Sequence, residues 1–263
     1  MGNRIEDRLK ALQEKNEKAL ITYMTAGLPD MEGTKAIIKA QEEAGTDVVE
    51  LGIPFSDPIA DGPVIQQASY ESIQRGTNLG RVFAMVEELR QDCQIPLVFM
   101  MYYNTVLHYG LWEFADKCAQ CGVDGLIIPD LPFEEQGELQ NALEKVEGAP
   151  ILLQLVSPVS KDRIPAIVQN ARGFVYCVSS MGVTGQEADF HKNVKVYLQG
   201  VKAESKIPVM MGFGIRSAAD VEPMKECIDG AIVGSHFITM MKENNYEQEA
   251  IKKYIRDFKE RMN

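Results

Sequence analysis

The sequence is poor in the residues that build metal centres and disulfide frameworks. It contains 3 histidines, 5 cysteines and 1 tryptophan among 263 residues. The cysteines are odd in number and scattered through apolar stretches, which is typical of reduced thiols in a reducing compartment. Only Cys118 and Cys121 are closely spaced, within a helical pattern and with no second His or Cys pair beside them. The sequence therefore predicts no metal site and no redox pair.

Positive charge and long apolar runs are also scarce. The formal net charge is -11, and clusters such as Lys252-Lys253 are short and flanked by acids, so a nucleic-acid partner is not expected. No apolar stretch approaches the ~20 residues that cross a membrane. The charged start, residues 3–10, is unlike a signal peptide, and we expect a cytoplasmic protein. An anionic small substrate is still allowed, because backbone N–H groups can bind phosphate.

Short apolar runs alternate with amphipathic stretches along the whole chain. The runs are nearly continuous in hydrophobic residues, which is typical of parallel strands covered by helices on both faces. The stretches between them carry apolar residues at the three and four spacing of helices. Strands are expected at residues 20–25, 48–53, 97–102, 125–129, 151–156, 174–179, 209–212 and 231–234, and helices at 32–44, 79–90, 134–144, 162–171 and 218–227.

Eight strands that alternate with helices predict an α/β fold, a (β/α)8 TIM barrel that forms a single domain over residues 1–263. Extra helices are expected at the N-terminus, residues 4–15, and after the second strand, residues 64–74. A doubly wound open sheet would share the alternation, but it normally carries a Gly-rich G-x-G-x-x-G turn after its first strand. This chain has only Ala26-Gly27-Leu28-Pro29 there, so the barrel is favoured.

Acidic residues collect where the second expected strand ends. Glu50 belongs to that strand, where a carboxylate is costly to bury, and Asp57 and Asp61 follow in the loop. A buried carboxylate either has chemistry to perform or forms a structural cap or ion pair, and Glu50 alone does not decide between these. In this fold the chemistry lies at the carboxyl ends of the strands, where Asp130 also falls. A tyrosine within a strand is more often core, so Tyr23, Tyr102 and Tyr176 remain open.

Glycines follow three consecutive strands near the end of the sequence. They occur at Gly182–Gly185, at Gly212 and Gly214, and at Gly234 before Ser235. Glycine allows backbone N–H groups to approach phosphate oxygens closely, and barrels commonly bind phosphate after their seventh and eighth strands. An isolated Gly-x-Gly usually makes only a turn. Three sites after consecutive strands favour a phosphate cradle.

These stretches together resemble the tryptophan synthase alpha chain family. The matching motifs are Glu-Leu-Gly-Ile-Pro-Phe-Ser-Asp-Pro from Glu50, Ala-Asp-Gly-Pro from Ala60, Pro-Asp-Leu-Pro from Pro129, Gly-Val-Thr-Gly from Gly182, Gly-Phe-Gly-Ile from Gly212 and Gly-Ser at Gly234. The resemblance implies a lyase that cleaves indole-3-glycerol phosphate to indole and glyceraldehyde 3-phosphate without a cofactor of its own. It also implies a pyridoxal-phosphate-dependent beta chain as partner in an alpha2-beta2 assembly.

The resemblance also implies roles for individual residues. Glu50 and Asp61 would be the catalytic pair, and Gly185, Gly214, Gly234 and Ser235 would hold the phosphate, with Tyr176 beside them. Such a retro-aldol cleavage needs an acid to protonate indole C3, which suits a buried Glu50, and an ionised Asp61 to bind the indole N–H. The loops at 55–63 and 181–190 would close over the ligand. The expected indole lining consists of Tyr23, Met101, Tyr102, Ile127, Tyr176 and Phe213.

Two positions depart from the common pattern of that family. Ser180 stands where many members carry a basic residue, and Tyr23 stands where Phe is common; little change of reaction is expected from Tyr23. Three other functions stay open at this point. The first is a free-standing lyase that releases indole, and the second is a mainly regulatory partner of the beta chain. The third is another sugar-phosphate barrel enzyme, such as an epimerase or isomerase, although such an enzyme would lack the turn that carries Glu50 and Asp61.

Overall fold

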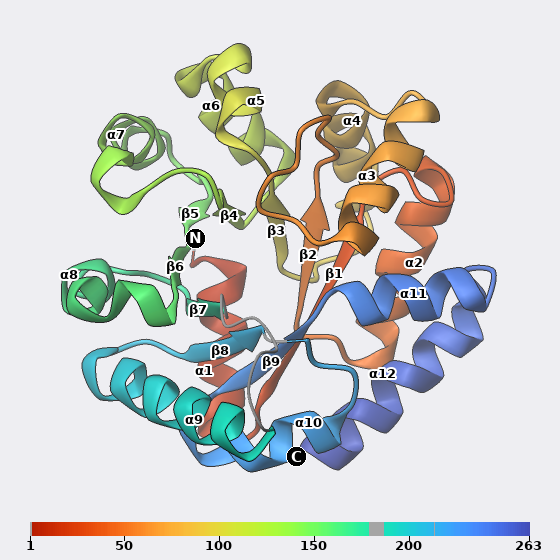
Figure 1. The fold of residues 1–263 in the computed structure, drawn as a ribbon. Helices are drawn as coiled ribbons and strands as arrows, with labels where there is room; N and C mark the ends of the chain where they lie inside the picture. The colour runs from red at the N-terminus through yellow and green to blue at the C-terminus, as the bar shows by residue number, and fades with distance from the viewer. Residues whose placement is uncertain (1, 179–186, 213) are drawn as a thin grey trace.

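One parallel sheet organises the molecule, with its strands around a common centre and its helices outside (Figure 1). The computed structural model describes residues 2–178, 187–212 and 214–263. The strand order is β5-β4-β3-β2-β1-β9-β8-β7-β6. The strands are β1 Ala19–Thr25, β2 Val48–Gly52, β3 Leu97–Met100, β4 Gly125–Ile127, β5 Ile151–Leu152, β6 Gln154–Val156, β7 Val175–Val178, β8 Val209–Gly212 and β9 Gly230–Val233.

The fifth expected strand, residues 151–156, is divided into β5 and β6, and this division accounts for nine strands instead of eight. β5 pairs with β4, whereas β6 pairs with β7. Leu153 joins the two pieces, and its N–H still donates to Leu126 O at 2.9 Å. One continuous segment thus links both ends of the sheet, which confirms the predicted (β/α)8 barrel.

The helices cover the outside of the sheet (Figure 1). Both predicted extra helices are present, as α1 and α3, and two helices follow β3. The α-helices are α1 Arg4–Glu14, α2 Met31–Ala44, α3 Pro63–Gln74, α4 Leu79–Leu89, α5 Tyr103–Tyr109, α6 Leu111–Cys121, α7 Gly137–Lys145, α8 Ile164–Val168, α9 Glu187–Glu204, α10 Ala218–Val221, α11 Ser235–Glu243 and α12 Gln248–Met262. Short 3-10 helices lie at Phe133–Glu135, Pro158–Arg163 and Glu222–Cys227. Among the described residues, no helix is long and apolar enough to span a membrane.

Alternate residues of each strand point into the barrel, and this alternation decides which side chains reach the site. Ile21, Val48, Val98, Ile127 and Ile232 are buried together in an inner cluster. The residues between them pack outward against the helices in a larger cluster. Inward side chains further along the same strands therefore meet at the carboxyl end of the barrel.

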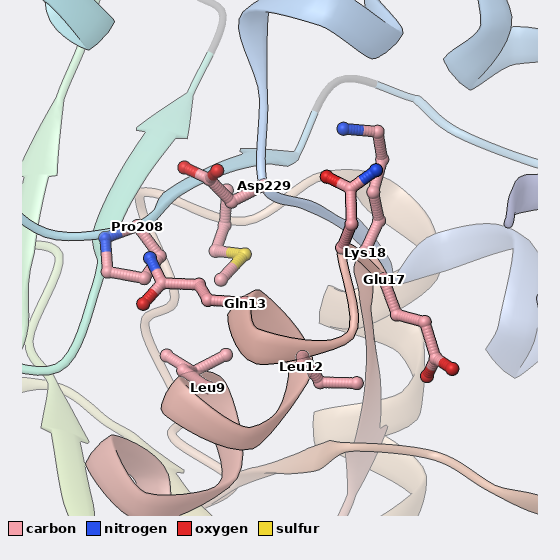
Figure 2. Close-up of a pocket in the computed structure, with 9 residues that line it drawn as sticks. Leu9, Leu12, Gln13, Glu17, Lys18, Pro208 and Asp229 are labelled. Atoms are coloured by element: carbon pink, nitrogen blue, oxygen red, sulfur yellow. The ribbon is translucent and has the colours of Figure 1, made fainter.

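Helix α1 closes the opposite, amino-terminal end of the barrel. Asn3 caps the helix by accepting from the Ile5 N–H at 3.0 Å. Leu9 and Leu12 are 3% exposed and pack with Ile5 into the inner cluster. Figure 2 shows these leucines beside a small pocket that Lys18 and other polar residues also line. The volume of the pocket is about 120 Å³. The apolar stripe of α1 thus completes the core where the strands begin.

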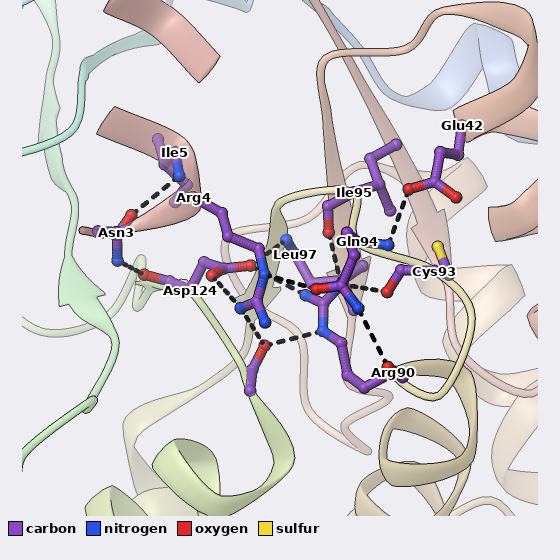
Figure 3. Close-up of polar contacts among 11 residues, drawn as sticks. Asn3, Arg4, Ile5, Glu42, Arg90, Cys93, Gln94, Ile95, Leu97 and Asp124 are labelled. Atoms are coloured by element: carbon purple, nitrogen blue, oxygen red, sulfur yellow. Dashed lines mark hydrogen bonds and ion pairs between the residues drawn. The ribbon is translucent and has the colours of Figure 1, made fainter. Parts of the chain in front are cut away.

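Aspartates placed directly before three strands tie neighbouring strands together at this end. Asp47, Asp124 and Asp229 each accept a backbone N–H from the start of the adjacent strand, at 2.7–2.8 Å. Each also pairs with at least one cationic side chain. Figure 3 shows Arg4 and Arg90 converging on Asp124, which is only 4% exposed. Because a buried charge is costly without partners and these three aspartates have partners, we assign them a structural role.

Candidate active site at the carboxyl ends of the strands

Glu50 is a buried carboxyl group without a partner on the inward face of β2. It lies opposite Tyr23 of β1 and Val98 of β3, and it is 0% exposed. Neither carboxyl oxygen has a hydrogen-bond partner among the described residues. Burial raises the pKa of Glu50 to about 8, so the group holds its proton at neutral pH and is able to donate it. A structural cap or ion pair, the alternative left open by the sequence, is not formed within the described part of the chain.

Asp61 is half-buried in the loop between β2 and α3, and Tyr102 fixes its position. The Tyr102 hydroxyl donates to Asp61 Oδ2 at 3.0 Å and accepts from the Ala60 N–H at 2.9 Å. The Tyr102 ring stacks on Phe55, with centroids 4.9 Å apart. Burial raises the pKa of Asp61, and the hydrogen bond from Tyr102 opposes that rise. Tyr102, predicted as indole lining, thus also anchors the loop that carries Asp61.

Two inward tyrosines lie across glycines of the neighbouring strands. Tyr23 leans from β1 over Gly52 of β2, and a methyl group at Gly52 would overlap its hydroxyl and ring. Tyr176 leans in the same way from β7 over Gly212 of β8, where an added Cβ would lie 2.6 Å from Cε1 of the ring. Both glycines therefore make room for an aromatic ring close to Glu50. This close approach, and not a turn, explains why glycine occupies those two strand positions.

Replacing Gly52 with Ala is expected to displace Tyr23, because backbone and ring cannot both keep their places. Overpacking of this kind destabilises a protein by about 1–3 kcal/mol. The measurement is the free energy of unfolding in urea. The matched double variant Gly52→Ala/Tyr23→Phe lacks the overlapping hydroxyl and should recover part of the loss. An unchanged free energy of unfolding in Gly52→Ala would show that Tyr23 does not occupy this position.

A cavity of about 500 Å³ opens beside Tyr176, between the ends of β7, β8 and β9 and helix α11. Of the predicted site residues, Tyr176, Gly214, Gly234 and Ser235 line it. Gly214 has φ +57°, and no atom of the described residues is found within 4 Å of its missing Cβ, so the described structure leaves open space at a backbone position that favours glycine. Gly234 precedes the first turn of α11, which no described side chain caps. Open N–H groups at a helix start suit an anion.

Sequence reasoning missed several residues of this cavity. Arg216, His236 and Thr239 line it, together with Ile65 of α3 and Ile232 of β9. Arg216 and His236 directly follow Gly214-Ile215 and Gly234-Ser235, so their positions after the glycine motifs were the available signal. Phe55, which stacks on Tyr102, was also missed because nothing in the sequence pairs the two rings.

Met100 ends β3 and Met101 directly follows it, and the two side chains face opposite sides. Met101 belongs to the outer cluster between the strands and the helices, whereas Met100 also contacts the inner cluster. This placement favours Met100 over the predicted Met101 as a lining residue. Ile127 is fully buried within the inner cluster, beneath the site. Gly185 and Phe213, both predicted site residues, and Ser180 lie outside the described residues.

Two other acids near this end, Asp130 and Asp57, are not among the described residues that line the cavity. Asp130 accepts from the Tyr103 N–H at 2.9 Å and so supports the start of α5. Asp57 is exposed and accepts from its neighbour Ser56. The predicted loop at 55–63 leads into α3, and the one at 181–190 ends within α9, since residues from 187 onward are helical. Residues 181–186 of that loop lie outside the described part.

The cysteines take no part in this arrangement. All five are free and buried. Burial raises the pKa of the Cys121 thiol to about 12 and that of Cys118 well above its usual value, so neither is a reactive thiolate. Over the described ranges, no three His, Cys, Asp or Glu side chains gather as they would around a metal ion.

Comparison with known proteins gives a uniform result. The family model described as tryptophan synthase alpha chain matches residues 9–263. The tryptophan synthase alpha chain of Lachnospira eligens is 62% identical over 262 residues, which cover 99% of both chains. That of Alkaliphilus metalliredigens is 46% identical, over 97% of this chain and 96% of its own.

Solved structures agree with the sequence relatives. Tryptophan synthase subunit alpha from Legionella pneumophila superposes with a TM-score of 0.90 at 32% identity, covering 100% of this chain and 99% of its own. A tryptophan synthase structure from Mycobacterium tuberculosis gives a TM-score of 0.88 at 34% identity, covering 100% and 99%. The resemblance read from the motifs is thereby confirmed. The chain belongs to the tryptophan synthase alpha chain family and performs the alpha-chain step of tryptophan biosynthesis, the lyase cleavage of indole-3-glycerol phosphate.

Proposed function

We propose that Glu50 and Asp61 are the catalytic pair of this cleavage, with Glu50 as the proton carrier and Asp61 as the electrostatic partner. The observation that carries the proposal is the buried carboxyl of Glu50, which has no partner among the described residues and a pKa of about 8. A group held protonated without a structural bond is suited to deliver its proton to a substrate. Asp61, held by Tyr102 in a more open position, is the better candidate for the ionised acid.

The reaction then consists of two proton transfers through Glu50 and the cleavage of one carbon–carbon bond. Glu50 donates its proton to indole C3, which leaves positive charge on the ring nitrogen, and ionised Asp61 stabilises that charge through the indole N–H. The resulting Glu50 carboxylate takes the proton from the glycerol hydroxyl next to the ring. The bond between C3 and the glycerol chain breaks as the aldehyde forms, and its electron pair returns to the ring. The products are indole and glyceraldehyde 3-phosphate, and Glu50 regains its proton.

The substrate would lie across the mouth of the barrel. The indole ring would lie between the Glu50 side chain and the loop that carries Asp61, against Tyr23, Met100 and Tyr102. The phosphate fits the cavity beyond Tyr176, where Gly214, Gly234 and Ser235 present backbone N–H groups and a hydroxyl. Of the residues expected from the sequence, Gly185 would add to the phosphate cradle and Phe213 to the indole lining. Because the proton carrier and the phosphate cradle come from different strands, the rigid barrel fixes the distance between them.

The family implies a beta chain partner, and we propose an alpha2-beta2 assembly in which the beta chain covers this same face and receives the indole. Large apolar side chains are exposed on the loops and helices that follow the strands. Ile59 and Val159 are each 84% exposed, Leu107 is 51% exposed and Phe133 is 37% exposed. They follow β2, β6, β3 and β4 in turn, so they share the end of the barrel that carries Glu50. Exposed apolar residues on one face favour a protein partner there.

Glu50 supplies both proton transfers and Asp61 the charge stabilisation, so the proposed reaction needs no cofactor in this chain, and pyridoxal phosphate belongs to the beta partner. We also propose a cytoplasmic location, which five free, buried thiols support.

The proposed function predicts that the purified chain consumes indole-3-glycerol phosphate and that added beta chain accelerates the reaction. The measurement follows indole and glyceraldehyde 3-phosphate together, with the chain alone, with the beta chain and with the beta chain only. Equal amounts of both products are expected in the first two cases. A pair of chains that forms a complex but leaves the substrate intact would contradict the lyase assignment and favour a regulatory subunit.

A further inference from the structure

The cavity beside Tyr176, proposed above to hold the phosphate, is lined by two basic residues that lie outside the family motifs. Among its described lining residues, Arg216 and His236 are the two that can be cationic, and none is acidic. This composition contrasts with the formal net charge of -11 for the whole chain. It also contrasts with the acid pair at the other end of the proposed substrate position. The two ends of the site are therefore oppositely charged.

Arg216 and His236 reach the cavity from different segments. Arg216 lies on the exposed loop between β8 and α10, just after Gly214. His236 is the second residue of α11 and is half-buried, directly after Ser235. The two residues thus follow directly on the glycine and serine positions proposed to hold the phosphate. A ligand in the cavity would therefore meet a basic side chain from each of the two segments.

Tyr254 of helix α12 holds these two segments together. Its hydroxyl donates to Arg216 O at 2.7 Å. Its ring lies against the His236 ring, with centroids 5.8 Å apart. The Tyr254 ring also packs on Phe237 and Phe258, at 5.7 Å and 6.0 Å, and both of those rings are buried. A tyrosine that packs in the core thus contacts both Arg216 and His236, so ligand binding would need to order these two residues less.

Asp220, the acid that contacts the Arg216 backbone, is already engaged. Asp220 Oδ2 accepts the backbone N–H groups of Arg216 and Ser217, at 2.9 Å and 2.8 Å, and completes the capping box of α10. The Asp220 carboxylate therefore stabilises the start of α10. Among the described residues, none of the ion pairs within 4.0 Å includes the guanidinium of Arg216. The guanidinium remains available for an anion in the cavity.

We infer that Arg216 and His236 bind the phosphate group of the substrate through charge-assisted hydrogen bonds, and that Tyr254 is the positioning residue for both. The inference rests on the proposed function, which places a phosphate monoester in this cavity. Backbone N–H groups and Ser235 would fix the location of the phosphate, whereas Arg216 and His236 would favour its negative charge. The site would then select a charged phosphate ester over an uncharged analogue of the same shape.

The test compares two ligands by calorimetry at pH 6: indole-3-propanol phosphate, which cannot be cleaved, and indole-3-propanol, its uncharged counterpart. Arg216→Gln should weaken binding of the phosphate ester about tenfold, and His236→Gln about three- to tenfold, the effect of losing one hydrogen bond to a charged group. Both should bind the uncharged alcohol within twofold of the parent protein. Lys10→Gln, at an exposed position on α1 at the other end of the barrel, removes the same charge and should change neither affinity.

Tyr254→Phe keeps the ring and removes the bond to Arg216 O, so it should weaken binding of the phosphate ester about two- to fivefold and leave the alcohol unaffected. A purely structural role would weaken both ligands alike, and the midpoint of thermal unfolding identifies a folding defect. If Arg216→Gln and His236→Gln bind the phosphate ester as the parent does, the inference is wrong, although the parent's preference for the ester still supports the proposed function. If the parent itself does not prefer the ester, the phosphate position of the proposed function fails as well.

Discussion

Glu50→Gln should lower kcat for cleavage of indole-3-glycerol phosphate by about 10³-fold or more. Glutamine keeps the size and polarity of the side chain but can neither give nor take the proton, and general acid–base catalysis by one residue contributes about 10²–10⁴-fold. Glu50 is proposed to serve in two proton transfers, which places the expected loss toward the upper part of that range. The measurement is a single-turnover rate with the beta chain present, so that weak partner binding does not limit the comparison.

The same substitution should stabilise the protein at alkaline pH. A carboxyl whose pKa rises from 4.5 to about 8 on folding binds its proton more tightly in the folded state. Its contribution to stability is therefore complete below pH 4.5 and is lost as pH rises toward 8. This shift corresponds to roughly 3–5 kcal/mol of destabilisation at pH 9 relative to pH 4.

Glu50→Gln has no such titration, so its free energy of unfolding should exceed that of the parent above pH 8, with the two converging at lower pH. Lower activity together with greater alkaline stability is the signature of a buried catalytic carboxyl, since replacing a purely structural acid would lower both activity and stability. A variant that keeps more than a tenth of the parental rate while it stays folded would refute the assignment of Glu50.

Asp61→Asn should lower kcat by about 10²–10³-fold, the usual effect of removing one group that stabilises charge in the transition state. Asparagine can still accept the Tyr102 hydroxyl, so the loop should keep its place while the negative charge is lost. The Michaelis constant should change little, because the charge on the ring nitrogen develops only after substrate binding.

Tyr102→Phe is the matched control for Asp61. It removes the hydrogen bonds to Asp61 and Ala60 but keeps the charge and the stacking on Phe55, and we expect a smaller loss of about three- to tenfold in kcat. The decisive result is which of the two variants, Asp61→Asn or Tyr102→Phe, loses more kcat. Should Tyr102→Phe lose as much activity as Asp61→Asn, loop position and not negative charge would be the contribution of Asp61.

The fold was predictable because its signals are local and repeated. Each buried parallel strand is a short apolar run, and each covering helix carries an apolar stripe, so the number and order of units follow from the sequence. The split at Leu153 was not predictable, since a continuous apolar run does not reveal where a strand changes its hydrogen-bonding partner. The same absence of alternation hid the facing of Met100 and Met101.

The site was only partly predictable for a related reason. Glu50 stands out because a lone acid within an apolar strand is conspicuous, and the glycines stand out because they follow consecutive strands. Arg216 and His236 look like ordinary surface residues until the barrel brings the ends of β8 and β9 together. Likewise, the contact between Tyr254 and Arg216 spans 38 residues and depends on how α12 packs.

The most direct test of the central claim is the ionisation of Glu50 itself. Infrared difference spectra during a pH titration, with Glu50→Gln as the reference, isolate the carbonyl band of this one protonated carboxyl group. The band should persist through neutral pH and disappear with a midpoint near pH 8. A midpoint near 4.5, the ordinary value for glutamate, would mean that Glu50 is ionised at neutral pH and cannot be the proton donor.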